Sequence, residues 1–192
     1  MKRILVAHKA ADGSLVDVET QFKGTATRPI LMLGSGGAER ERAILATLPG
    51  KAELSARGSL PVLLGGGLGH ALGELLDRTP DDLPVAVVDK EDDILALTRL
   101  RQRFASPRIR WICGPDASRA LAELTSWQEA CGGGPLLPLV HPFYFRLDRP
   151  WYQEIRRHAE ASSRFDFWRK AVQPRFREAS PRLLLITSKY FL

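Results

Sequence analysis

The sequence predicts an α/β protein whose largely parallel β-sheet carries helices on both faces, preceded by a small antiparallel β unit. Two observations predict this class. From Leu60 onward, short continuous apolar segments alternate with helix-like segments, which is typical of parallel strands buried on both faces. Before Leu60, apolar and polar residues alternate singly, which is typical of strands with one face in water.

The main part of the chain is expected to hold five strands and four helices. The expected strands cover residues 62–64, 85–88, 109–113, 136–140 and 183–186. The expected helices cover residues 68–76, 92–104, 117–126 and 151–172. In such an open sheet, ligands bind where the carboxyl ends of the strands meet.

Residues 3–33 are expected to form the small β unit. Asp12 and Gly13 form a hairpin turn signal between two alternating segments, and residues 29–33 form a further apolar strand. A glycine cluster at 34–37 then leads into an expected helix at 38–48, rich in Glu and Arg. We interpret this cluster as a loop and helix start, because no strand ending in an acid follows it at a suitable distance.

A second glycine cluster is the strongest functional signal. Gly65, Gly66, Gly67 and Gly69 directly follow an apolar strand and lead into the expected helix at 68–76. Glycine allows a sharp turn and leaves no Cβ between the main chain and a ligand. The N-terminus of the following helix offers free N–H groups and a positive partial charge, so the segment is built like a nucleotide-binding turn.

Acids follow at the ends of the next two strands. Asp89 lies about 20 residues after the glycines, where an acid can accept hydrogen bonds from ribose hydroxyls. Asp116 follows the next strand. The dinucleotide pattern G-x-G-x-x-G fails because position 70 is His70, which argues against an NAD-linked oxidoreductase; the pattern that fits is G-x-G-x-G.

The glycine cluster, Asp89 and Asp116 resemble, in their order and in their positions after successive strands, the ligand-binding motifs of the class I S-adenosylmethionine-dependent methyltransferases. The resemblance is to their spermidine-synthase-like relatives in particular. The resemblance covers roughly residues 60–140. It implies that the glycines approach an adenosine-type ligand such as S-adenosylmethionine, that Asp89 binds the ribose, and that Asp116 binds the adenine amino group. The alternative is a Rossmann-like sheet that keeps its tight turns and binds no ligand.

The fourth expected strand ends at His141-Pro-Phe-Tyr144. In the families that the chain resembles, this position holds functional residues: a catalytic aspartate in the aminopropyltransferases, and an Asn/Asp-Pro-Pro-aromatic motif in the amino-methyltransferases. This chain has neither. His141 and Tyr144 are the candidate catalytic residues, with His141 a possible base because histidine titrates near neutral pH. The alternative is structural: His141 ends the strand and Tyr144 packs beside it.

Composition narrows the remaining classes. The 192 residues have a net charge of +6, with Arg and Lys spread along the chain. Two cysteines without metal or redox spacing indicate free thiols in a reducing cytoplasm, and no metal site is expected. The sequence has no signal-peptide pattern and no apolar run near the ~20 residues that span a bilayer.

Aromatic and basic residues mix in the segment 146–182. Such mixing can bind single-stranded nucleic acid. Trp151, Ile155 and Ala159 recur at helical spacing, however, which favours an amphipathic helix packed on the sheet. We therefore do not expect a nucleic-acid partner.

We divide the chain into an N-terminal β unit plus helix at 1–58, a methyltransferase-like Rossmann domain at 59–180, and a segment at 181–192 that is either the last strand or the start of a further C-terminal domain. The final segment resembles the opening of the sugar-transferase domain of CgeB-type, spore-maturation-like glycosyltransferases. That resemblance implies a further transferase domain after residue 192.

Two functions follow from the sequence. The first is a module that binds S-adenosylmethionine or a related ligand, with methyl transfer as the favoured chemistry. The second is a non-catalytic accessory or scaffold domain of a glycosyltransferase, which the missing acid at the fourth strand favours.

Overall fold

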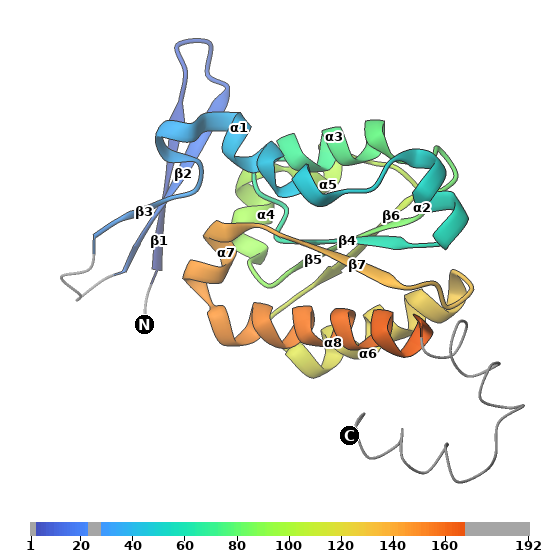
Figure 1. Cartoon of the computed structure of the whole chain (residues 1–192). Helices are drawn as coiled ribbons and strands as arrows, with labels where there is room; N and C mark the ends of the chain where they lie inside the picture. The colour runs from blue at the N-terminus through green and yellow to red at the C-terminus, as the bar shows by residue number, and fades with distance from the viewer. Residues whose placement is uncertain (1–2, 23–27, 168–192) are drawn as a thin grey trace, which may run out of the picture.

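The computed structural model describes residues 3–22 and 28–167, which form two sheets with helices around the larger one (Figure 1). The strands are β1 Arg3–Lys9, β2 Leu15–Phe22, β3 Ile30–Leu31, β4 Leu60–Leu64, β5 Val85–Asp89, β6 Ile109–Cys113 and β7 Leu136–Val140. The helices are α1 Gly37–Arg42, α2 Lys51–Arg57, α3 His70–Arg78, α4 Asp92–Thr98, α5 Leu100–Arg103, α6 Ala117–Ala130, α7 Pro142–Leu147 and α8 Arg149–Phe167. Two short 3-10 helices, η1 Gly34–Gly36 and η2 Ala43–Thr47, flank α1.

The larger sheet is parallel and has the strand order β6-β5-β4-β7. The first strand of this unit, β4, lies between β5 and β7, so the chain runs outward twice from the middle of the sheet. That reversal is a switch point, beside which open α/β sheets bind ligands. The predicted α/β class, with a parallel sheet, helices on both faces and a small antiparallel unit, is confirmed at this level.

Each face of the parallel sheet has its own apolar core, because successive strand residues point to opposite faces. On the face covered by α6 and α8, Val62 and Val88 pack with Ile155. On the opposite face, Leu63 and Val87 pack with residues of η2, α2 and α3. The uninterrupted burial of β4 and β5 explains why their sequences are continuously apolar.

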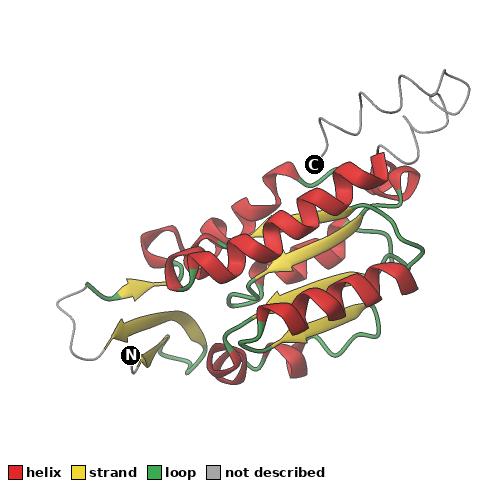
Figure 2. Cartoon of the chain, turned by 90° about the horizontal axis from the view of Figure 1, so that it is seen from below, coloured by secondary structure: helices red, strands yellow, loops and turns green. Residues whose placement is uncertain are grey.

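The antiparallel sheet, in the order β1-β2-β3, lies at the end of the molecule where the parallel strands finish (Figures 1 and 2). Its inner face adds Val18 to the same core as the α8 side of the sheet. Arg3 of β1 forms ion pairs with Glu91 and Asp93, which directly follow β5. The N-terminal unit therefore covers the carboxyl edge of the parallel sheet.

Several helix predictions differ from the structure. The helices α3 and α6 extend two and four residues beyond their expected ends, the helix expected at 38–48 is α1 followed by η2, and α2 and α7 were not expected. The helix expected at 92–104 is two helices, α4 and α5, separated at Arg99, whose φ of 52° is left-handed. A left-handed residue ends a helix, and no glycine marks this position in the sequence. The helix expected at 151–172 begins earlier, at Arg149, and is described to Phe167; the strand expected at 183–186 lies outside the described residues.

Within residues 3–22 and 28–167, none of the helices combines the length and the apolar character needed to cross a membrane.

The centre of the parallel sheet should dominate stability. We predict that Leu63→Ala lowers the free energy of unfolding by about 2–5 kcal/mol, because Leu63 is fully buried and truncation leaves a cavity. Leu97 on α4 is 36% exposed, so Leu97→Ala should cost less than about 1 kcal/mol. Urea unfolding of both variants measures the difference, and equal costs would contradict this account of the core.

Candidate functional site

The carboxyl edge of the parallel sheet collects the residues singled out in the sequence. The glycine loop, Gly65–Gly69, follows β4, and Asp89 is the last residue of β5. Asp116 lies between β6 and α6, and His141 follows β7. The four strands are parallel, so these positions share one edge, as the sequence predicts.

The first three N–H groups of the glycine loop already have partners. Gly65 N–H donates to the carbonyl of Val88 at 2.9 Å, within the edge of the sheet. Gly66 N–H donates to Oδ2 of Asp89 at 2.9 Å, and Gly67 N–H donates to the hydroxyl of Tyr144 at 3.1 Å. None of these three donors points at open solvent.

A carboxylate from α1 takes up the next donors. Glu41 is fully buried, and its two oxygens accept hydrogen bonds from Leu68 N–H at 3.0 Å, Gly69 N–H at 2.9 Å and Ala71 N–H at 3.1 Å. Burial raises the pKa of Glu41, while these N–H groups act in the opposite direction. The first turn of α3, where a ligand phosphate or carboxylate would bind, thus holds an anion supplied by the protein itself.

Side chains also fill the space that the glycines leave free. A Cβ on Gly65 would lie 2.3 Å from the ring of Tyr144, and a Cβ on Gly67 would lie 2.7 Å from the carboxylate of Glu41. A Cβ on Gly69 would lie 2.7 Å from Leu100. In this structure the glycines are needed for close internal packing, whether or not a ligand also binds.

Asp89 is enclosed. It is fully buried, and Oδ1 accepts hydrogen bonds from Glu91 N–H at 2.8 Å and from the Tyr152 hydroxyl at 3.1 Å. Burial raises its pKa to about 7, against the opposing effect of these donors and of Gly66 N–H. Ribose hydroxyls could reach this carboxyl only if Tyr152 moved.

Asp116 is the most accessible of the predicted ligand residues. It is exposed, and its side chain accepts a hydrogen bond from Arg119 N–H at 3.2 Å. This is the N-cap interaction of α6, which satisfies one of the free donors at a helix start. The structure thus gives Asp116 a structural role and leaves its adenine contact a prediction.

The two candidate catalytic residues are buried side by side, with ring centroids 5.2 Å apart. His141 Nδ1 accepts from Phe143 N–H at 3.3 Å, which begins α7, and burial lowers the His141 pKa to about 3, with a smaller contribution from Arg40. Burial also raises the pKa of Tyr144 well above 10. Both side chains are therefore neutral near pH 7, and their catalytic roles stay predictions.

Two residues on which this edge depends, Glu41 and Tyr152, were not predicted as site residues. Glu41 lies in a run of alternating Glu and Arg that reads as a solvated helix. Tyr152 lies in the segment of mixed aromatic and basic residues at 146–182, and its hydroxyl accepts from Lys90 N–H at 3.0 Å and donates to Asp89. The burial of an acid such as Glu41 cannot be predicted from its neighbours in the sequence, because it depends on packing against segments that are distant in the sequence.

The described part of the chain contains no cluster of three or more His, Cys, Asp or Glu side chains that could hold a metal ion. Comparison of the chain with known protein families, curated proteins and solved structures gives no match.

Two variants separate the cost of a steric clash at the glycine loop from the cost of backbone strain. Gly65 and Gly13 both have positive φ, 91° and 82°, but a Cβ on Gly13 would meet no atom within 4 Å. We predict that Gly13→Ala costs about 1–2 kcal/mol from backbone conformation alone. Gly65→Ala should cost about 1–3 kcal/mol more, because the Tyr144 ring must move.

Thermal or urea unfolding of the two glycine variants measures this difference. Equal destabilisation would contradict the close contact between Gly65 and Tyr144.

The raised pKa of Asp89 predicts a pH dependence. Between about pH 4 and pH 7 the folded protein keeps a proton on Asp89 that the unfolded chain releases. This contribution to stability is complete below pH 4 and is lost as the pH rises toward 7, by roughly 1.4 kcal/mol per pH unit. Asp89→Asn cannot ionise, so its stability should fall less steeply over this window.

Urea unfolding of the wild-type chain and Asp89→Asn at pH 4.5, 5.5 and 6.5 compares the two slopes. Parallel slopes would show that Asp89 is ionised throughout and would contradict its raised pKa.

Proposed function

We propose that the described region is a non-catalytic accessory module, built on a methyltransferase-like α/β fold, that supports a transferase domain of the same protein. One observation carries the non-catalytic role: the carboxylate of Glu41 accepts hydrogen bonds from Leu68 and Gly69 of the glycine loop and from Ala71 of α3. A nucleotide or S-adenosylmethionine would need those donors. The protein satisfies them internally. The transferase domain rests on the sequence resemblance of residues 181–192.

The surroundings of the loop support the same function. Asp89 is held by Tyr152, and Glu91 is paired with Arg3 of the small sheet. The neutral, buried His141 and Tyr144 offer no charged group to a reacting substrate. Each group that could bind or react at this edge has a partner within the fold or is shielded from water.

A second candidate is binding of S-adenosylmethionine or a related adenosine ligand. The observation that favours it is the shared edge: the glycine loop, Asp89 and Asp116 follow successive strands in the order that the resemblance to methyltransferases requires. On this proposal, α1 moves away on binding, so that the ligand carboxylate replaces that of Glu41. Methyl transfer would then rest mainly on positioning of the two reactants.

Calorimetric titration with S-adenosylmethionine and S-adenosylhomocysteine separates the two candidates. We predict no binding to the wild-type chain at ligand concentrations up to about 1 mM. Any remaining affinity would then be weaker than a dissociation constant of about 1 mM, which corresponds to a binding free energy of about −4 kcal/mol. Micromolar binding that Asp89→Ala abolishes would overturn the accessory role and establish an adenosine site.

Glu41→Ala is the informative third sample in that titration. If the variant binds either ligand and the wild-type chain does not, Glu41 is the group that closes an otherwise competent site. If neither chain binds, the glycine loop serves packing alone, as the accessory role requires.

A further inference from the structure

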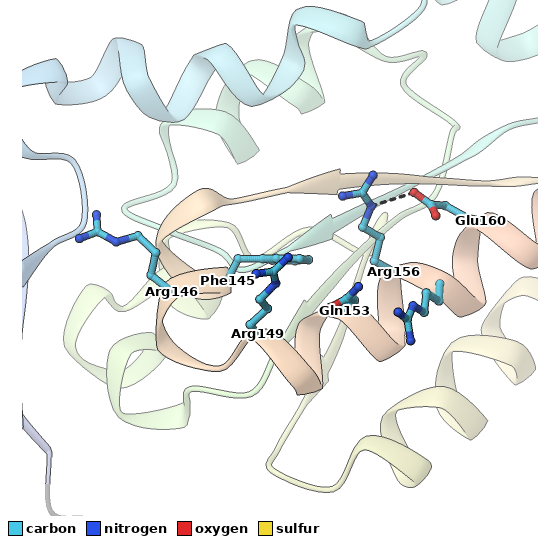
Figure 3. Close-up of a pocket in the computed structure, with 7 residues that line it drawn as sticks. Phe145, Arg146, Arg149, Gln153, Arg156 and Glu160 are labelled. Atoms are coloured by element: carbon cyan, nitrogen blue, oxygen red, sulfur yellow. Dashed lines mark hydrogen bonds and ion pairs between the residues drawn. The ribbon is translucent and has the colours of Figure 1, made fainter.

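A pocket beside α7 and α8 is lined mainly by arginine side chains (Figure 3). Its charged lining includes Arg146, Arg149, Arg156 and Arg157, all of them exposed. Arg146 lies in the last turn of α7, and the other three follow on α8 at helical spacing. One surface thus carries four guanidinium groups within 12 residues of sequence.

One of these four arginines is ion-paired, and the other three have no acidic partner among the described residues. Arg156 pairs with Glu160 at 2.7 Å, as Figure 3 shows. Among the described residues, no carboxylate lies within ion-pair distance of Arg146, Arg149 or Arg157. Clustered positive charges repel each other, so an anion bound among them would relieve that repulsion.

The remaining lining suits a small organic anion. Phe145 and Gln153 are half-buried between the arginines and supply an aromatic face and an amide. The pocket encloses about 540 Å³, and a second hollow of about 450 Å³ shares Arg149, Gln153 and Arg157 with it. Sites for small ligands typically measure about 300–1,000 Å³.

We propose that this pocket binds the diphosphate group of a small-molecule ligand. The planar guanidinium group presents paired N–H donors that match the oxygens of a phosphate, and several arginines together match a multiply charged group better than a single carboxylate. Glu160 also lines the pocket but is paired with Arg156, so Arg146, Arg149 and Arg157 are the arginines that the diphosphate would contact. The proposal is independent of the glycine loop.

Titration with sodium pyrophosphate at low ionic strength tests the proposal directly. The wild-type chain should bind it, and the double variant Arg149→Gln/Arg157→Gln should bind at least about tenfold more weakly. The control, Arg57→Gln/Arg119→Gln, makes the same charge change at two exposed arginines on α2 and α6, which are paired with Glu53 and Glu123, and should bind like the wild-type chain.

A variant with the opposite sign adds a second test. Glu160→Gln releases Arg156 and removes a negative charge from the pocket, so it should bind pyrophosphate about two- to fivefold more tightly. Absence of pyrophosphate binding, equal weakening in the two double arginine variants, or weaker binding by Glu160→Gln would each overturn the proposal.

Parallel titrations with ADP and UDP identify the source of the diphosphate. Tighter binding of a nucleotide than of pyrophosphate, lost in Phe145→Ala, would identify a nucleotide ligand that stacks on the ring. Equal binding of all three would identify the diphosphate group itself as the ligand. S-adenosylmethionine carries no phosphate, so these results do not depend on the outcome at the glycine loop.

Discussion

The hydrogen bonds of the Glu41 carboxylate determine what the carboxyl edge of the sheet can do. A glycine loop followed by a helix N-terminus is an anion site by construction, because its N–H groups have no partner within the helix. Here the first turn of α3 receives that anion from α1. The N-terminal segment is thereby tied to the sheet, and the small antiparallel sheet follows it onto the same edge, where Arg3 pairs with Glu91.

Most of the fold could be predicted from the sequence because its signals are local. The four described strands of the parallel sheet are short, mostly apolar segments, and two of them, β6 and β7, have the bounds that their hydrophobic pattern predicts. The break at Arg99 could not be predicted, since its left-handed conformation is imposed on a residue with no preference for it. Local pattern determines where an element forms, and tertiary packing determines where it stops.

The site was predicted less completely, for a physical reason. The positions of the glycine loop, Asp89 and Asp116 follow from strand order, and the structure brings them to one edge as expected. Whether these groups face a ligand or each other depends on contacts between residues far apart in sequence, such as Asp89 and Tyr152, whose positions differ by 63. No spacing rule encodes such contacts. The arginines of α8 were interpreted from their sequence as one polar face of a packed helix, and only the structure gathers them with Arg146 around a pocket.

Hydrogen exchange of single amides tests most directly whether Glu41 closes the glycine loop. The account predicts that the N–H groups of Leu68 and Gly69 are protected in the wild-type chain and lose that protection in Glu41→Ala. Gly65 N–H, bonded to the carbonyl of Val88, should stay protected in both and so reports that the variant is folded. Rapid exchange of Leu68 and Gly69 in the wild-type chain, with Gly65 protected, would contradict the account and leave the loop open to a ligand.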